Sequence, residues 1–279
     1  MTTRVTRGVV RFALVTLTLA GCGRQVAPDP SIGLDLPAIG PDQTTPPTPP
    51  PHVVAAMDAT GGVAAWMQAR RLTFSGVVTA YQSDGSFYLT EHTFDICPWG
   101  NAIQVSAREP QTRLTCRIMD GQYRLLSGDV KADVSPLGVR CRDYAEAEFE
   151  IATAPVRLLD DSVTLLRRPM PVMISGAWYY PIEATFETQK IASNGAGPEG
   201  VTTVEPYWTQ GVYFQNQNGS RVDIIWLGNP VTQKFLMVRG YNHAPIAKDG
   251  VQVPTKVEIF QSDAEATQGQ RLALIDLKR

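Results

Sequence analysis

The chain has 279 residues and a formal net charge of −2. A mildly acidic chain lacks the basic surface by which proteins bind nucleic acid, so no nucleic-acid partner is expected. The 53–279 region, which follows a proline-rich segment, is long enough for one large domain.

Residues 1–21 have the layout of a cleaved secretory signal. Arg4, Arg7 and Arg11 precede an apolar run that begins at Phe12. This run of about 10 residues is far shorter than the ~20 that a membrane-spanning helix needs. Cleavage removes three arginines and no acidic residue, so the formal charge changes from −2 to −5.

The leader ends in Leu19-Ala20-Gly21-Cys22, which resembles the lipobox of bacterial lipoproteins. The resemblance implies that Cys22 becomes a lipidated N-terminus, carrying acyl chains such as palmitate, and anchors the chain to a membrane. The alternative is ordinary cleavage beside a chance cysteine. Gly23 stands where an inner-membrane retention signal often has aspartate. The resemblance therefore favours the periplasmic face of the outer membrane over the inner membrane.

Residues 22–52 contain nine prolines and end in "TTPPTPPPH". The segment has no apolar periodicity, and its composition favours an extended, semi-rigid spacer. About thirty residues at ~3.1 Å each reach on the order of 90 Å. We therefore expect a tether that lets a folded body over 53–279 work away from the bilayer.

The first segment of that body predicts a helix. In "HVVAAMDATGGVAAWMQARRL", apolar residues such as Val53, Met57, Val63 and Met67 recur at helical spacing. The pair Gly61-Gly62 interrupts this pattern and predicts a kink. We expect one amphipathic helix, broken at the glycines, that packs on a sheet.

From Phe74 onward the apolar period changes to two, which predicts a β-meander. Turns after Cys97, near 109–112 and at Asp120-Gly121 fix the strand registers. One lateral row of apolar residues results: Phe94, Val105, Cys116 and Leu125. A neighbouring row has the same sidedness: Ile96, Ile103, Ile118 and Tyr123. Because three separate turns agree on one buried face, the sequence supports a sheet with this register.

Three cysteines remain in the body, so one disulfide and one free thiol are the most that can form in the oxidising periplasm. By strand parity Cys97 should point outward and Cys116 inward. The two also lie two strands apart, ~9–10 Å, beyond the ~7 Å limit between the Cα atoms of a disulfide. Any bridge must then involve Cys141, and Cys116–Cys141 is the predicted pair.

The middle of the chain, 131–176, loses this alternation. "PVRLLDDSVTLLRRP" has apolar residues at helical spacing, which predicts a helix over 155–168 followed by the loop "PMPVMISG". Strands resume at Tyr179 and continue to the C-terminus, for a total of ten or eleven.

The run "EHTFD" offers Glu91, His92 and Asp95 as candidate metal or catalytic residues. On a strand Glu91 and His92 point to opposite faces, and no second histidine of the body is near in sequence. We therefore expect solvated surface residues here. The sequence has no HExxH, nucleophile elbow, phosphate loop or CxxC, so we expect no metal, no cofactor and no enzyme activity.

The order of the expected elements resembles that of the LolA/LolB-like superfamily of periplasmic lipid and lipoprotein carriers. The order is a helix containing "GGVAAWMQARRLTFSG", a meander, a helical insertion, a second meander and a closing "PTKVEIFQSD" segment. The resemblance implies an α+β, mainly β domain. In that family an incomplete, strongly bent antiparallel β-barrel is closed by helices and holds acyl chains. Two apolar loops, "PMPVMISGAW" and "PWGN", are candidates for the exposed hydrophobic loop of the receptor-type members.

Under this resemblance seven apolar residues line a cavity: Phe74, Val78, Phe94, Ile96, Ile103, Val105 and Leu125. The alternative is that they form a packed core, because core and greasy pocket need the same residue types. Arg239 shares strand parity with Phe235 and Met237. It is a candidate contact for a lipid headgroup or a lid; the alternative is an exposed arginine on the outer face.

The sequence thus predicts a tethered, non-enzymatic lipoprotein that binds or accepts lipid or lipoprotein acyl chains in a β-barrel cavity. Each buried CH₂ contributes ~0.8 kcal/mol to such binding. A periplasmic carrier protein is a candidate partner. The alternative function is a structural or protein-interaction lipoprotein with a filled core and no ligand.

Overall fold

The computed structural model describes residues 49–108, 113–119, 121–128, 140–160, 163–187, 189–192, 201–204, 206–246 and 250–278. All of them belong to one compact unit, Leu36–Arg279. The predicted signal, Cys22 and most of the predicted tether lie outside the described residues. None of the described helices is long and apolar enough to cross a bilayer.

The domain begins with two short helices, α1 (Pro51–Asp58) and α2 (Val63–Gln68). Pro51 occupies the first turn of α1, where its missing N–H costs no hydrogen bond. Gly61 and Gly62 separate the helices with φ angles of 117° and 98°. A Cβ atom on Gly61 would lie 2.4 Å from the carbonyl oxygen of Gly250. The predicted break at the two glycines is therefore confirmed.

The first meander consists of β1 (Leu72–Tyr81), β2 (Phe87–Cys97), β3 (Ala102–Arg108), β4 (Arg113–Met119) and β5 (Gln122–Ser127). Its registers are those expected from the turns. Phe94 pairs with Val105, Val105 with Cys116, and Cys116 with Leu125. The second row, from Ile96 to Tyr123, pairs in the same way. Both predicted rows are confirmed.

The predicted helix over 155–168 is wrong. Only 155–157 of that range are helical, in α4 (Ala154–Arg157), which follows α3 (Cys141–Ala152); strands β6 (Val163–Arg167) and β7 (Val172–Ile174) come next. Residues of β6 alternate between buried Val163 and exposed Thr164 because β6 pairs with a later strand. The sequence of α3 did not show its helix because the buried positions include Asp143, Glu148 and Glu150. These acids interrupt the apolar periodicity.

The second meander consists of β8 (Ala177–Phe186), β11 (Gln210–Asn216), β12 (Val222–Asn229), β13 (Lys234–Pro245), β14 (Gln252–Ser262) and β15 (Gln268–Leu277). Between β8 and β11, the strands β9 (Gln189–Ala192) and β10 (Val201–Val204) form a separate two-stranded ribbon. Fifteen strands are described instead of ten or eleven, because β6, β7 and this ribbon were not all read as strands from the sequence.

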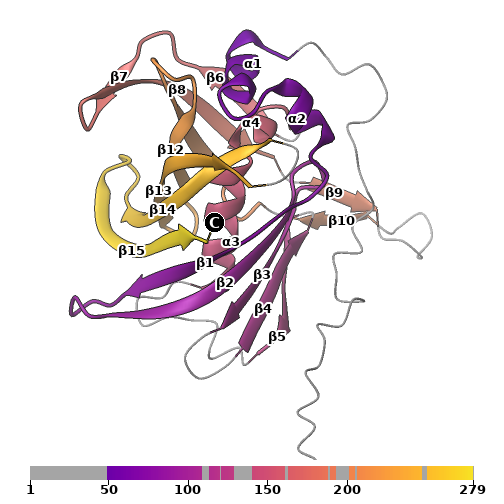
Figure 1. The fold of residues 1–279 in the computed structure, drawn as a ribbon, viewed down its shortest axis with the longest axis vertical. Coiled ribbons are helices and arrows are strands. Elements are labelled where there is room, and N and C mark those ends of the chain that lie inside the picture. Colours follow the sequence, from indigo (N-terminus) through magenta and orange to yellow (C-terminus); the bar gives the residue numbers. More distant parts are fainter. Residues whose placement is uncertain are drawn as a thin grey trace, which may run out of the picture. The chain divides into compact units, whose positions relative to one another are not determined.

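The large sheet contains 13 antiparallel strands in the order β5-β4-β3-β2-β1-β15-β14-β13-β12-β11-β8-β6, with β7 beside β8 (Figure 1). Within the described residues its end strands, β5 and β6, do not pair, so the curved sheet remains open. The expected fold class, a mainly β, incomplete and strongly bent barrel with helices, is confirmed.

Helix α3 fills the hollow of the curved sheet. It contacts strands from both meanders, β3 and β4 on one side and β12, β13 and β14 on the other (Figure 1). A disulfide joins Cys141, the first residue of α3, to Cys116 of β4, with Cα atoms 6.3 Å apart. This is the pair that the strand registers left as the candidate bridge. It fixes the N-terminal end of α3 to the first meander.

Three side chains of β2 that we expected at the surface are buried. Cys97 is buried because the turn after β2 folds over it, and Gly100 donates to the Cys97 carbonyl at 3.2 Å. His92 is 2% exposed, with its ring 5.3 Å from that of Tyr144 on α3. Asp95 accepts hydrogen bonds from Arg71 and is also buried. The expectation of solvated residues holds for Glu91 and is wrong for His92 and Asp95.

Candidate functional site

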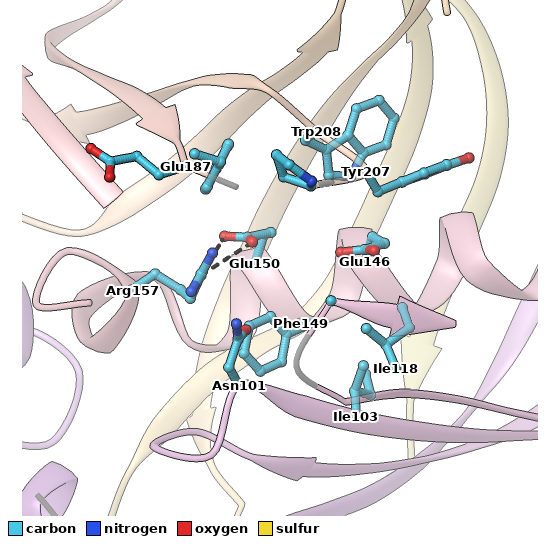
Figure 2. A pocket seen from close by; sticks show the side chains of 13 residues that line it. Asn101, Ile103, Ile118, Glu146, Phe149, Glu150, Arg157, Glu187, Tyr207 and Trp208 are labelled. Carbon is cyan, nitrogen blue, oxygen red and sulfur yellow. Dashed lines mark hydrogen bonds and ion pairs between the residues drawn. The ribbon is translucent and has the colours of Figure 1, made fainter. Parts of the chain in front are cut away.

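A cavity of about 60 Å³ lies where the two ends of the open sheet approach each other (Figure 2). One wall comes from β3 and β4, near the β5 end of the strand order, and the other from the end of β8 and the chain before β11. Helices α3 and α4 form the rest of the lining. We call it the seam cavity. Its apolar walls are formed by Ile103, Ile118, Phe149, Phe186 and Trp208.

A buried ion pair lies beside these apolar walls. The Glu150 carboxylate accepts a hydrogen bond from Arg157 Nε at 3.2 Å and one from the Tyr213 hydroxyl at 2.5 Å. Figure 2 shows Arg157 pointing toward Glu150. Arg157 also pairs with Asp160. Burial opposes the charge of Arg157, but Glu150, Tyr213 and Asp160 together raise the pKa of this guanidinium above its ordinary value. The ion pair joins α3 to α4, and the hydrogen bond from Tyr213 joins the C-terminal end of α3 to β11.

Two carboxyl groups of α3 keep their protons more strongly than usual. Burial raises the pKa of Glu146 to about 7, although Arg142 Nε lies 3.4 Å from its carboxylate. Burial alone raises the pKa of Glu148 to about 8, and neither Glu148 oxygen has a hydrogen-bond partner in the described part of the chain. Of these two carboxyl groups, Glu146 lines the seam cavity and Glu148 does not. In its neutral form Glu146 can donate a hydrogen bond to a ligand.

The seam cavity has a second candidate donor. Trp208 is almost fully buried, and its Nε1 has no hydrogen-bond partner among the described residues. Buried donors are seldom left unpaired. The lining thus combines aromatic and aliphatic walls with a few fixed polar groups. This is the usual composition of sites that bind amphipathic small molecules.

Of the seven apolar residues expected at a cavity, only Ile103 lines the seam cavity. Five others are buried in the core cluster to which residues of α3 also belong: Phe74, Val78, Phe94, Ile96 and Val105. Leu125 is half-buried at the β5 edge and packs against this cluster. Six of the seven positions therefore match the packed-core alternative. The curved sheet does not enclose a large empty space there, because α3 occupies it.

Arg239 lies on the opposite face of the sheet, beside a second apolar cluster that includes Phe235, Met237 and Phe260. Its guanidinium carbon is 6.0 Å from the centroid of the Phe260 ring. Arg239 Nη1 donates to Ser175 Oγ at 3.2 Å. Ser175 is in the turn between β7 and β8, so Arg239 connects this hairpin to the main sheet.

The same hairpin exposes apolar side chains to solvent. We call residues 166–178 the apolar arm. Leu166, Met170, Val172, Met173 and Trp178 are all exposed there, Met170 by 74% and Met173 by 59%. The other candidate loop, "PWGN", is not exposed in this way. Its Trp99 is half-buried and donates to the Trp66 carbonyl at 2.9 Å.

Apart from Ile103, the residues that form the seam cavity were not identified as cavity residues from the sequence. Glu146 and Glu150 belong to α3, the helix that the periodicity did not indicate, and Arg157 stands at the end of α4, within the predicted helix over 155–168. The one signal for Glu146 and Glu150 in the sequence is that acidic residues are frequent in 141–152, where apolar and polar residues do not alternate. Within the described residues, no group of three or more His, Cys, Asp or Glu side chains has the geometry to hold a metal ion.

Comparisons with known proteins give likenesses of fold. No family model matches the chain, and no curated protein matches it. Among solved structures the chain is similar to a LolA superfamily protein from Nitrosomonas europaea, with 12% identity and a TM-score of 0.47. That alignment covers 81% of this chain and 90% of the other.

Two further solved structures are similar. One is a DUF1329 family protein from Desulfovibrio piger, with 11% identity, a TM-score of 0.41 and coverage of 76% of this chain and 85% of the other. The second is a putative outer membrane lipoprotein-sorting protein domain from Vibrio parahaemolyticus, with 7% identity, a TM-score of 0.42 and coverage of 75% and 83%.

Proposed function

We propose that this chain is a lipid-anchored periplasmic protein that binds the apolar chains of lipids or lipoproteins at the seam cavity, without catalysing a reaction. One observation supports the proposal most. Apolar walls and unpaired or neutral polar groups meet in a cavity at the opening of a bent sheet. Transfer of an acyl chain from water to such walls is favourable by ~0.8 kcal/mol per CH₂.

The anchor belongs to the same proposal. Cys22 carries the lipid, and the proline-rich segment separates it from the domain that begins at Pro51. The chain then works at the periplasmic face of the outer membrane. A periplasmic carrier protein that delivers an acylated cargo is the partner that fits this location. Neither a cofactor nor a metal is needed for transfer of an apolar chain.

The seam cavity must widen to accept a chain. At 10–15 Å³ for each water-sized probe, about 60 Å³ holds only a few water molecules. Helix α3 cannot move easily, because a disulfide holds one end and the Glu150–Arg157 pair holds the other. In the part of the chain that the structure describes, the β9–β10 ribbon pairs with no strand of the main sheet. Displacing the two strands of the ribbon breaks no described hydrogen bond of that sheet, so we propose that the ribbon moves.

The polar groups at the cavity suit the head of an amphipathic ligand. Glu146, whose pKa of about 7 leaves part of its population protonated at neutral pH, can then donate to an ester or carboxyl oxygen, and the Trp208 indole is a second donor. The Arg157 guanidinium is already engaged by Glu150 and Asp160, so its charge is largely neutralised. A neutral or weakly polar head therefore fits better than a strongly anionic one.

A titration with a fluorescent fatty acid tests the proposal. The exported chain carries Cys22→Ser in all samples, so that no attached lipid competes. Ile118→Phe fills the seam cavity and should weaken probe binding at least tenfold. Leu125→Phe, a similar enlargement on neighbouring β5 outside the cavity, should leave it within about twofold. Absence of saturable binding to the wild-type chain would contradict the proposal.

The alternative, an interaction lipoprotein with a filled core, is favoured by a different observation. Helix α3 fills the hollow of the sheet, while the apolar arm remains exposed. Contiguous exposed apolar side chains often mark a docking surface. Two results together would support this alternative over the seam proposal. The wild-type chain would bind no fatty acid, and Met173→Asp would abolish binding of a periplasmic partner.

A further inference from the structure

A second hollow lies where the tether enters the domain. It is an open groove of about 470 Å³ between the first turn of α1, the end of β6 and the turn that joins β11 to β12. We call it the root groove. Pro51 and His52, the first residues of α1, form one side, and Arg167 and Tyr180 form another. The groove is separate from the seam cavity, with which it shares no lining residue.

The root groove contains a positive charge that the protein does not neutralise. The guanidinium carbon of Arg167 lies 4.2 Å from the centroid of the Tyr180 ring, which holds it by a cation–π contact. Arg167 makes no ion pair within the described part of the chain, and no described residue that lines the groove is acidic. The neighbouring Arg168 differs, because its Nε and Nη2 donate to Glu183 at 2.7 and 2.8 Å.

His52 adds an unsatisfied polar atom to the same groove. Its Nε2 is shielded from solvent and has no hydrogen-bond partner among the described residues. The His52 carbonyl accepts from Gln215 Nε2 at 2.8 Å, which fixes the residue at the start of α1. Burial, and then the nearby Arg167, lower the pKa of His52. The imidazole is therefore neutral at pH 7 and can still donate one hydrogen bond.

The remaining polar lining consists of amides and a hydroxyl. Gln217 and Ser220 come from the β11–β12 turn, and both can donate to an oxygen in the groove. The groove thus combines a fixed guanidinium, an imidazole, an amide and a hydroxyl, with no opposing carboxylate. Guanidinium groups bind phosphate through paired, charge-assisted hydrogen bonds, and a tetrahedral oxyanion has enough acceptors for all four groups.

We propose that the root groove binds a phosphate group, with Arg167 as the principal contact and His52, Gln217 and Ser220 as hydrogen-bond donors. A phospholipid headgroup and a free phosphate share this chemistry. A lipid source is compatible with the position of the groove. Arg167 follows Leu166, the first residue of the exposed apolar arm, and the groove adjoins the root of the tether. A bound headgroup would orient the domain on the bilayer to which it is tethered.

The test compares two arginines that are adjacent in sequence. The exported chain with Cys22→Ser is titrated with inorganic phosphate, and binding is followed by calorimetry and by the NMR shifts of the His52 imidazole. It is also floated with vesicles of phosphatidylcholine, or of an equal mixture of phosphatidylcholine and phosphatidylglycerol. Arg167→Gln removes the proposed contact. Arg168→Gln removes the same charge outside the groove and is the matched control.

We expect Arg167→Gln to weaken phosphate binding about tenfold or more, as loss of a charged hydrogen bond does, and Arg168→Gln to leave it within about twofold. If the same difference appears with the mixed vesicles, the source is a lipid headgroup. If it appears only with inorganic phosphate, the source is soluble and the phosphate site still stands. Two results would overturn the proposal: no binding to either probe, or equal weakening by both arginine substitutions.

Discussion

The hollow of the curved sheet and the apolar arm are both rich in apolar side chains, but only those of the hollow are covered by another element of the chain. In the hollow, α3 covers the sheet, and residues such as Phe94 and Ile96 have no exposed surface. On the arm, Met170 and Met173 remain mostly exposed. The difference shows that apolar composition alone does not locate a ligand. Helix α3 covers the apolar side chains of the hollow, whereas the exposed apolar side chains of the arm are available to another molecule.

The closure of the hollow depends on polar as well as apolar contacts. A disulfide attaches α3 to the first meander at Cys141, and the Glu150–Arg157–Tyr213 cluster attaches its other end to the second meander. The attachments of the arm that the structure describes are exposed polar contacts, the Arg168–Glu183 pair and the hydrogen bond from Arg239 to Ser175. We therefore expect substitutions in the hollow to affect stability, and substitutions in the arm to affect interactions with other molecules.

The largest expected effect comes from Arg157→Met. The substitution leaves the Glu150 carboxylate buried without its cation, which costs about 3–5 kcal/mol of unfolding free energy. Urea denaturation followed by circular dichroism measures the loss. Arg168→Met is the control on the arm, because it breaks an exposed pair with Glu183 worth about 0–1 kcal/mol. Similar losses in the two variants would contradict the difference between hollow and arm.

The second effect concerns the disulfide. Replacing Cys116 and Cys141 together by alanine opens a loop with a sequence separation of 25 residues. The loop-entropy relation gives a loss of about 3.5 kcal/mol in unfolding free energy. Denaturant titration of the double variant, beside the wild-type chain with and without reductant, measures it. A loss much below 1 kcal/mol would mean that the bridge adds little to what already holds α3 in the sheet.

The third effect depends on pH. The Glu148 carboxyl has an ordinary pKa of 4.5 in the unfolded chain and about 8 in the folded domain, because it is buried. Between these values the folded state binds more protons, so its stability falls as the pH rises from about 4.5 to about 8. Glu148→Gln should reduce that slope and add on the order of a few kcal/mol at the alkaline end.

Denaturant titrations at several pH values measure the Glu148 effect. Part of the slope should remain in Glu148→Gln, because burial also raises the pKa of Glu146 to about 7. Equal slopes in the variant and the wild type would show that Glu148 is solvated or paired in solution.

The smallest effect on stability is expected on the arm. Trp178→Ser replaces a side chain that is 46% exposed, so the unfolding free energy should change by about 0.5 kcal/mol or less. Trp66→Ser makes the same change at a fully buried tryptophan and should cost about 3–5 kcal/mol. Retention on a hydrophobic column should fall for Trp178→Ser alone, if both variants stay folded. A large loss of stability in Trp178→Ser would show that the arm is part of the core.

The first meander could be predicted residue by residue because its information is local. Short turns set each register, and strand parity then places Phe94, Val105 and Cys116 in one row. Helix α3 could not be predicted in the same way. Two of its buried acids, Asp143 and Glu150, are hydrogen-bonded by residues distant in sequence, Tyr207 and Tyr213, which sequence periodicity does not reveal.

The seam cavity was inaccessible to sequence reasoning for a related reason. Its lining comes from short pieces of β3, β4, α3, α4, β8 and the chain before β11, so no single segment carries its pattern. His92 has the same strand parity as buried Phe94, so parity already placed it on the inner face, against the expectation of a solvated residue. Here the covering residue is Tyr144 of α3, an element missing from the expected fold.

Native mass spectrometry of the gently purified exported chain with Cys22→Ser tests the central claim most directly. If the seam cavity takes up apolar chains, the wild-type domain carries a lipid-sized adduct, Leu125→Phe keeps it, and Ile118→Phe loses it. A wild-type domain that is free of lipid, or an adduct that persists unchanged in Ile118→Phe, would contradict the claim.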